Sequence, residues 1–288
     1  MTVNPIISVY LPTRNRARLF SEAVQSVLAQ SEKNLELIIV DDGSTDETPE
    51  ICKEIEKHDP RVIVVRQCAS VGAAVARNIA ISLAQGVFIT GIDDDDLMLP
   101  RRLESFLKNW SSYDSFLCSS FWLMRPSFSK YRLLNSGERC IGLQDLLYQN
   151  LVGNQLFTRT SFVLEVGGFD ERFVASQDYD LWTRLACRFG PGRRIDEATY
   201  VMRQGVASSS ISASSHFSQG ARQYTAKHFH LMSAAQRRSQ RLLHQITARQ
   251  RVAISDWPTF WALPTAGLFL RYWLSQFGWV SRIRNFVG

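Results

Sequence analysis

The sequence lacks several motifs that would identify a common function. Its five cysteines are scattered, odd in number and never arranged as C-x-x-C, so they predict neither a zinc site nor a disulfide framework and favour a reducing compartment. No G-x-G-x-x-G, G-x-x-x-x-G-K-[ST] or H-E-x-x-H is present, which argues against dinucleotide oxidoreductases, P-loop NTPases and zinc hydrolases. No basic stretch followed by an apolar run opens the chain, so we expect no signal peptide and a cytoplasmic protein.

Acidic residues are also scarce at one end of the chain. The 288 residues are 45% hydrophobic and 21% charged, which predicts a globular protein with a sizeable core. Ten of the 33 Lys and Arg residues lie in 216–288, but only one of the 27 Asp and Glu residues does. This tail therefore carries a net +9, whereas 1–215 carries 23 bases against 26 acids and a net −3. We expect the tail to meet an anionic membrane, a nucleic acid or an acidic partner.

Apolar runs alternate with helical patterns along the first 110 residues. This alternation predicts a parallel sheet with helices on both faces, an α/β fold. Ser44 with Glu47 predicts a capping box, and Pro100 a first helical position. Ligands of such sheets bind at the carboxyl ends of the strands. The strands are expected at 6–11, 35–40, 62–65 and 87–92, and the helices at 19–28, 44–57, 72–84 and 100–110.

Four consecutive aspartates, Asp93 to Asp96, follow the fourth strand. Crowded like charges after a buried strand call for a cation. If the strand geometry continues, Asp93 and Asp95 point to one side and can share an ion. Hard oxygen ligands favour Mg²⁺ or Mn²⁺. The alternative is a solvated turn that caps the next helix, which explains one or two aspartates but not four.

A second acidic turn, Asp41-Asp42-Gly43-Ser44, follows the second strand. A carboxylate at this position can accept a hydrogen bond from a base or a ribose hydroxyl. Taken alone, however, Asp-Gly is an ordinary turn and Ser44 an ordinary helix cap.

Six segments, in order, resemble the family 2 glycosyltransferases with the GT-A fold. The similarity covers about 5–205, and the details are similar to bacterial exopolysaccharide enzymes of the colanic acid type. It implies a Rossmann-like nucleotide-binding, mixed and mostly parallel sheet flanked by helices, with a C-terminal helical extension. The segments are Pro12-Thr13-Arg14-Asn15-Arg16, Val40 to Ser44, Gly72 with Ala76-Arg77-Asn78, Ile92 to Leu97 followed by Leu99-Pro100, Gly167 to Asp170 and Gln177 to Trp182; Gly153-Asn154-Gln155 accompanies them.

The resemblance assigns roles to individual residues. Thr13 and one of Asp41 or Asp42 would bind the base of a nucleotide sugar, and Asp93 or Asp94 would face the ribose. Asp95, with Asp93, would coordinate Mn²⁺ or Mg²⁺ on the diphosphate. Asp178 matches the catalytic base, although the same residue could simply cap a helix. The remaining residues expected near the nucleotide sugar are Pro12, Asn15 and Asn78.

Such a reaction transfers a single sugar with inversion. A divalent ion stabilises the leaving diphosphate, and one carboxylate deprotonates the acceptor hydroxyl. The chain departs from the family at two points: Gln177 replaces the usual Glu before the base, and no His follows Arg203, which leaves Gln177 and Arg203 as candidate contacts to diphosphate or acceptor. It also lacks the Q-x-x-R-W of processive synthases.

The basic tail is also rich in aromatic residues. Four of the seven tryptophans, Trp257, Trp261, Trp273 and Trp279, lie in the last 32 residues, interleaved with arginine. This composition fits a helix lying on an anionic membrane, or a helical lobe packed on the catalytic domain, and it carries no nucleic-acid motif.

The whole chain is thus expected to divide into a catalytic domain and an extension. The catalytic domain is 1–215, with a nucleotide-sugar half at 1–100 and an acceptor half at 101–215, and 216–288 is the basic helical extension. The expected partners are a UDP-, GDP- or dTDP-linked donor and a lipid-linked bacterial glycan at the inner face of the cytoplasmic membrane. A catalytically silent nucleotide-sugar-binding or scaffolding protein, and a nucleotidyltransferase, stay open as alternatives.

Overall fold

The protein was analysed as a computed structural model with two compact units, each described by itself. The first comprises 1–143, 151–172 and 177–210, and the second 144–150, 173–176 and 211–288. The structure describes residues 5–124, 131–204, 215–248, 250–253, 255, 264 and 266–276.

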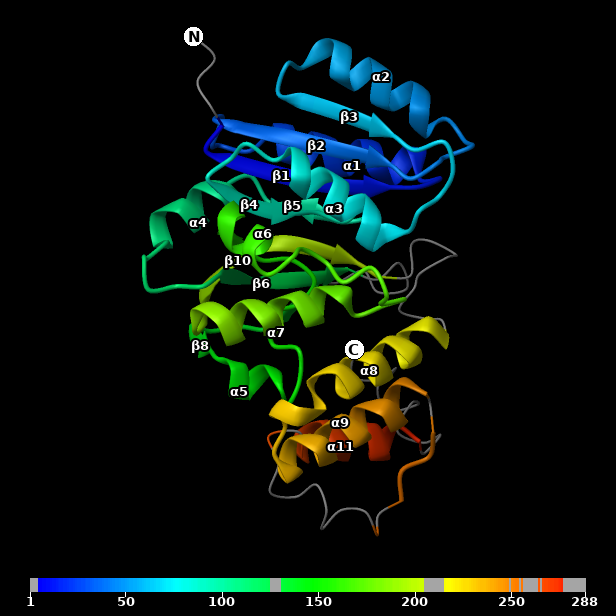
Figure 1. The fold of residues 1–288 in the computed structure, drawn as a ribbon, viewed down its shortest axis with the longest axis vertical. Helices are drawn as coiled ribbons and strands as arrows, with labels where there is room; N and C mark the ends of the chain where they lie inside the picture. The colour runs from blue at the N-terminus through cyan, green and yellow to red at the C-terminus, as the bar shows by residue number, and fades with distance from the viewer. Residues whose placement is uncertain are drawn as a thin grey trace. The chain divides into compact units, whose positions relative to one another are not determined.

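The first unit is built on a mixed sheet, with ten strands in the described residues. The order along the sheet is β3-β2-β1-β4-β9-β6-β10-β5, with β7 on β6 and β8 on β10 (Figure 1). The longest registers, β1 on β2 and β6 on β10, are parallel. The strands are β1 (Ile7–Thr13), β2 (Leu35–Asp41), β3 (Val62–Arg66), β4 (Phe88–Gly91), β5 (Leu97–Met98), β6 (Leu117–Met124), β7 (Arg132–Leu134), β8 (Arg139–Ile141), β9 (Phe157–Arg159) and β10 (Gly192–Arg203).

Helices connect these strands and cover the sheet. In α1, Phe20, Ala23, Val24 and Val27 recur at helical spacing and are buried, which explains why this segment forms an amphipathic helix. The helices of the first unit are α1 (Ala17–Leu28), α2 (Thr48–His58), α3 (Ala73–Leu83), α4 (Arg102–Asn109), α6 (Thr160–Glu165) and α7 (Gln177–Phe189). All but the first residue of α5 (Leu143–Leu146) belongs to the second unit.

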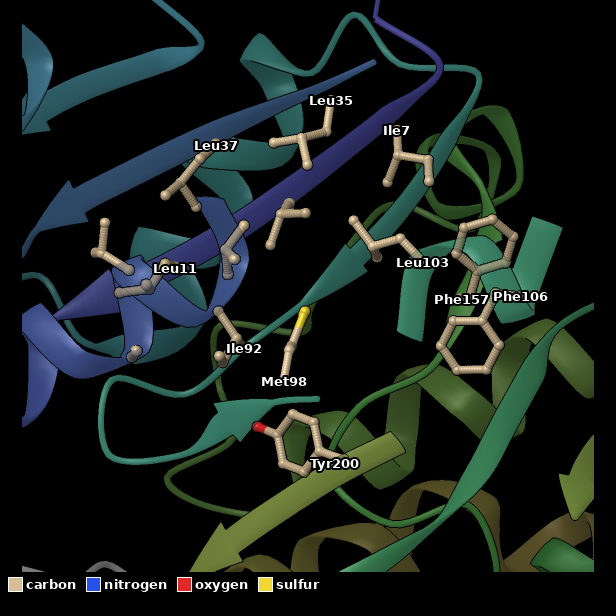
Figure 2. Packing of buried hydrophobic residues seen from close by; sticks show 14 of the residues in the cluster. Ile7, Leu11, Leu35, Leu37, Ile92, Met98, Leu103, Phe106, Phe157 and Tyr200 are labelled. Carbon is tan, nitrogen blue, oxygen red and sulfur yellow. The ribbon is translucent and has the colours of Figure 1, made fainter. Parts of the chain in front are cut away.

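One apolar cluster joins both halves of the sheet. Figure 2 shows Ile7 and Leu11 of β1 with Leu35 and Leu37 of β2 in the same cluster as Phe157. β2 is buried along its whole length because parallel strands have helices on both faces. This packing places the carboxyl ends of β1, β2 and β4 together at one edge, because the three strands run parallel in register.

Two predicted helix starts are wrong. Ser44 does not begin a helix: its hydroxyl accepts a hydrogen bond from the Asn15 amide at 2.9 Å, and α2 begins at Thr48. Pro100 lies two residues before α4, which begins at Arg102. In both places the segment is hydrogen-bonded to another part of the chain. The Pro100 carbonyl accepts from the Ser31 amide at 2.8 Å, as the Ser44 hydroxyl accepts from Asn15, and the helix starts later than local propensity indicates.

The second unit is helical in its described C-terminal part. A capping box at Ser233 and Gln236 begins α9, and Leu242, Val252 and Phe269 form a small core that Trp273 packs against. Trp257, Trp261 and Trp279 lie outside the described residues. No helix in the described part of the chain is both long and apolar enough to cross a membrane. The elements are α8 (Ser215–His228), the 3₁₀ turn η2 (Phe229–Leu231), α9 (Ala234–Thr247) and α11 (Ala266–Ser275).

Candidate active site

The four consecutive aspartates form a turn between β4 and β5. The strand ends at Gly91, and the Asp96 amide donates to the Asp93 carbonyl at 3.0 Å. The strand geometry therefore does not continue through this segment, and the predicted alternation of Asp93 and Asp95 does not apply. Each carboxylate instead has its own set of partners.

Asp94 is buried against the end of β1. Its Oδ2 accepts hydrogen bonds from the Thr13 hydroxyl at 2.9 Å and, more weakly, from the Arg14 amide at 3.4 Å. Burial raises the pKa of Asp94 to about 6, against the opposing charge of Arg16. Thr13 and Asp94, both predicted to contact the nucleotide sugar, thus lie side by side.

Asp95 faces Arg16, the residue that precedes α1. Arg16 Nη1 contacts Asp95 Oδ2 closely and lies 3.3 Å from Asp94 Oδ1. The Asp95 carbonyl accepts a hydrogen bond from Arg203 Nε, and Arg203 Nη1 pairs with Glu22 of α1. Burial, together with Asp93, raises the pKa of Asp95.

Asp93 is held from the other side of the site. Arg77 Nη2 donates to its Oδ1 at 2.9 Å, Gln155 Nε2 donates to the same oxygen at 3.1 Å, and Asn154 Nδ2 donates to Oδ2 at 2.9 Å. A Cβ added to Gly91 would lie 2.2 Å from the Tyr10 ring, so only glycine allows this close packing before the turn.

Asp96 is buried, and its carboxylate is hydrogen-bonded by other residues of the protein. Its carboxylate accepts hydrogen bonds from the Tyr200 hydroxyl and the Arg203 amide, both at 2.8 Å, and from Asn154 at 2.9 Å. Burial, together with the charges of Asp93 and Asp95, raises its pKa well above the usual range, although the hydrogen bonds from Arg203 and Tyr200 oppose that shift. Asp96 therefore fastens the turn to β10.

The two aspartates after β2 differ in the same way. Both Asp42 oxygens are occupied by the loop before α3: they accept from the Ser70 hydroxyl at 2.7 Å and from the Val71 and Gly72 amides at 2.6 and 3.1 Å. Asp41 accepts from the Ser44 amide through Oδ1, but its buried Oδ2 has no hydrogen-bond partner and lies 3.5 Å from Arg66 Nε. Of the two, Asp41 is the one with a free acceptor.

Three other predicted residues lie around these turns. Pro12 is part of β1, one residue before Thr13. Asn15 has a positive φ of 51°, and its Oδ1 accepts from the Thr45 amide at 2.8 Å, so it joins the turns after β1 and β2. Asn78 binds the Phe169 backbone through both ends of its amide and also donates to Glu171. The amide of Asn78 is thus engaged in joining α3 to the 168–171 segment.

Asp178 lies in the first turn of α7, near the donor-side residues. Burial raises its pKa to about 6; the charge of Arg77 opposes the shift and that of Asp93 adds to it. The neighbouring Gln177 is buried, and its Oε1 has no hydrogen-bond partner. Arg77 Nη1 is also buried without a partner, so the region between Asp93 and Asp178 contains unsatisfied polar groups.

Sequence reasoning gave no role to Arg16, Arg77, Asn154 and Gln155, although each stood in a quoted motif. They pair with the aspartates across 16 to 79 residues of sequence. The sequence pattern that could have indicated these contacts is the run of four aspartates with no basic residue beside it. Such a run predicts that bases distant in the sequence compensate the charge.

The carboxylates fit a divalent cation completed by substrate. Arg16 already occupies a cation position between Asp94 and Asp95, and both acids offer hard oxygen ligands. Among the described residues no group of three or more His, Cys, Asp or Glu side chains converges on one point. Mg²⁺ and Mn²⁺ commonly use one or two carboxylates together with water and substrate phosphates, which is the set available here.

The chain is similar in sequence to known glycosyltransferases. The model of glycosyl transferase family 2 matches residues 8–162. The chain is 37% identical over 206 residues to WcaA of Escherichia coli K12, named as a candidate colanic acid biosynthesis glycosyl transferase, covering 70% of this chain and 74% of WcaA. It is 28% identical over 215 residues to the glycosyltransferase GlyG of Streptococcus pneumoniae, covering 73% of this chain and 68% of GlyG.

Solved structures show the same fold. The 1–349 part of TarS from S. aureus, in complex with UDP-GlcNAc, superposes with a TM-score of 0.66 at 18% identity, covering 88% of this chain and 78% of that one. This chain covers 47% of a longer TarS structure. The mannosyltransferase PcManGT from Pyrobaculum calidifontis, in complex with GDP-Man and Mn²⁺, gives a TM-score of 0.53 at 20% identity, covering 93% and 74%. The expected GT-A fold is confirmed. With more than half of its residues matched by the family model, the chain belongs to glycosyl transferase family 2 and is a glycosyltransferase.

Proposed function

We propose that this glycosyltransferase transfers a single sugar from a nucleoside diphosphate sugar to a bacterial polysaccharide intermediate, with inversion and with a divalent metal ion. The main support for this proposal is that Arg77 pairs with Asp93 of the acidic turn and that its charge also lowers the pKa of Asp178. Donor-side carboxylates and a candidate base are thereby linked through one buried cation. An acceptor hydroxyl must be deprotonated beside the leaving diphosphate, and this arrangement supports that chemistry.

Asp178 is proposed as the general base. A pKa near 6 leaves the carboxylate mostly ionised at neutral pH while making it a better proton acceptor than an exposed aspartate. One carboxylate is sufficient for a single displacement, because attack opposite the leaving group inverts the anomeric centre without a covalent sugar–enzyme intermediate. Gln177 and Arg203 are proposed to contact the acceptor or the diphosphate, since each has a buried side-chain atom without a partner.

Asp95 and Asp93 are proposed to bind Mn²⁺ or Mg²⁺. Such an ion supplies Lewis-acid stabilisation of the leaving diphosphate. Asp94, together with Thr13, is proposed to bind the ribose, because the two side chains are already joined at the end of β1. Asp41 is proposed to bind the base through its Oδ2, which accepts no hydrogen bond and lies 3.5 Å from Arg66 Nε, with Asp42, Asn15 and Asn78 shaping the surrounding loops.

The relatives indicate the kind of pathway. WcaA is named for colanic acid biosynthesis, and TuaG of Bacillus subtilis, 43% identical over 104 residues, for teichuronic acid biosynthesis. By analogy with these named biosynthetic roles, we propose a lipid-linked glycan acceptor at the cytoplasmic face of the membrane. A peripheral membrane position is supported by exposed arginines of α9 that pair with no carboxylate in the described residues.

The decisive experiment measures release of nucleoside diphosphate from UDP-, GDP- and dTDP-sugars, with Mn²⁺, Mg²⁺ or EDTA and with membrane extract as acceptor source. We expect one donor class to be used, EDTA to abolish release, and Asp95→Ala to reduce it by at least about 100-fold. Silence of the folded protein with every donor and with extract would favour a nucleotide-sugar-binding protein instead. Release of pyrophosphate would indicate a nucleotidyltransferase.

A further inference from the structure

Arg16 is the closest cation to the acidic turn. Its Nη1 lies between Asp94 Oδ1, at 3.3 Å, and Asp95 Oδ2, with which it forms a short contact. The three side chains are 18%, 11% and 23% exposed, so the group is shielded but open to solvent at Asp95. Arg16 comes from the N-terminal end of α1, which positions it from outside the turn.

A guanidinium and a divalent ion cannot use the same carboxylate oxygen in the same direction. Mg²⁺ sits about 2.0–2.1 Å from its oxygen ligands and demands near-octahedral geometry, which leaves no room for an Nη1 hydrogen bond at that lone pair. The two cations also repel each other at this separation. A metal ion that binds Asp95 through the Oδ2 lone pair now used by Arg16 therefore requires Arg16 to leave that oxygen.

We propose that Arg16 is an exchangeable counter-cation, which gives up Asp95 to the metal ion and moves to the diphosphate of the donor. This inference rests on the metal dependence proposed above. If the metal ion bound alone, Arg16 would lose its carboxylate partner. If a diphosphate bound alone, it would add about two negative charges beside an acidic turn, which is unfavourable. Together, the ion and the diphosphate add almost no net charge and provide Arg16 with a new anion.

The rest of the turn stays anchored during such an exchange. The Asp95 carbonyl is bound by Arg203 Nε, and Asp96 is bound by the Arg203 amide at 2.8 Å. Asp94 keeps its hydrogen bond from Thr13. Only the Arg16 side chain needs to move, which makes the exchange local. Metal and donor binding should consequently be cooperative.

The test compares Arg16→Gln with the wild type, by titrating Mn²⁺ without nucleotide and following free Mn²⁺ by electron paramagnetic resonance. We expect Arg16→Gln to bind Mn²⁺ alone about 10-fold more tightly, and its melting temperature to rise more with Mn²⁺. In EDTA it should bind UDP, GDP or dTDP, whichever the wild type binds, more weakly. Arg18→Gln is the matched control, because Arg18 lies two residues away in α1, is 92% exposed and lies 3.9 Å from Glu22.

Two results would overturn the inference, and they are distinguishable. Unchanged Mn²⁺ affinity in a folded Arg16→Gln protein would show that Arg16 does not compete with the metal, while leaving the proposed function intact. Absence of Mn²⁺ binding to the wild type even with saturating nucleotide would overturn the metal dependence itself. Arg16→Lys, which keeps the charge but loses the planar fork, should stay close to the wild type in Mn²⁺ affinity and controls for folding.

Discussion

The burial of Asp178, the proposed general base, comes at a cost in stability. Its carboxylate lies in the first turn of α7, where burial raises its pKa to about 6 from an ordinary value of 3.8. In the unfolded chain the group ionises near 3.8, so the folded protein binds more protons between about pH 4 and 6. The folded state therefore loses stability as pH rises through that window.

Replacing Asp178 with Asn should separate these two effects. We expect transfer to fall by about 10²- to 10⁴-fold because the acceptor hydroxyl loses its base. The melting temperature should rise relative to the wild type above about pH 6, and the difference should disappear below about pH 4. Wild-type kcat should decline as pH falls through about 6, since the base becomes protonated. Rate measurements and thermal unfolding across pH 4–8 test these expectations.

Asp46→Asn provides a control of opposite sign. Burial of Asp46 is slight and is outweighed by hydrogen bonds from Thr48 and the Ala17 amide, which lower its pKa. Its carboxylate stabilises the fold above the unfolded pKa, so Asp46→Asn should lower the melting temperature at neutral pH and leave the chemistry intact. A loss of stability in Asp178→Asn at pH 7 would contradict the role of burial at that residue.

The acidic turn and β10 form the key connection between elements. Two residues of β10 bind the turn. The Tyr200 hydroxyl and the Arg203 amide donate to the Asp96 carboxylate, and Arg203 Nε donates to the Asp95 carbonyl. Asn154, which precedes β9, joins Asp93 to Asp96. The turn is thus positioned by residues of β10 and of the segment before β9, and such fixed positioning is what the proposed diphosphate site requires.

Removal of the Asp96 carboxylate should loosen this connection. In Asp96→Ala the Tyr200 hydroxyl, the Arg203 amide and the Asn154 amide lose an acceptor in a buried place, and each unpaired group costs about 1–3 kcal/mol. We expect the free energy of unfolding in denaturant to fall by about 3 kcal/mol. Glu50→Ala, an exposed acid on α2, should change it by less than about 0.5 kcal/mol. Equal small effects would show that Asp96 does not anchor the turn.

At the scale of the whole molecule, charge is distributed unevenly. The basic tail includes the exposed Arg237, Arg238 and Arg241 on α9, and Arg237 stacks on the exposed Phe229 at 3.8 Å. Arginine with exposed aromatic surface is the chemistry that binds anionic lipid headgroups. The helical core around Leu242 and Phe269 presents these side chains on a folded element.

Binding to lipid vesicles tests whether the exposed arginines of α9 contact an anionic membrane. We expect co-sedimentation with vesicles containing anionic phosphatidylglycerol at 0.1 M salt, and its loss at 0.5 M salt. The triple change Arg237→Gln, Arg238→Gln and Arg241→Gln should weaken binding by about 100-fold, because each surface base contributes about 1 kcal/mol.

A matched triple change removes the same charge from the first unit: Arg18→Gln, Lys53→Gln and Lys57→Gln, all exposed. It should leave vesicle binding within about threefold of the wild type. Equal loss in both variants would show that overall charge, rather than α9, governs binding.

The sequence by itself determined the fold and the family. Apolar runs such as Leu35 to Val40 form buried strands because a parallel sheet is covered on both faces, and the ordered motifs mark a family 2 glycosyltransferase. Helix starts were less predictable: Ser44 and Pro100 have the right local chemistry, but tertiary partners or geometry place the helices later.

Only the tertiary structure decided which acids are free and which are used internally. Asp41 and Asp42 are adjacent, yet Asp41 keeps one oxygen without a hydrogen bond, whereas both oxygens of Asp42 accept hydrogen bonds from the loop before α3. Likewise Arg16 and Arg77 reach the acidic turn from α1 and α3. Hydrogen bonding and charge compensation depend on distances between side chains that are far apart in the sequence. The local sequence does not specify these distances. The partners of these side chains are therefore decided only when the strands assemble into the sheet.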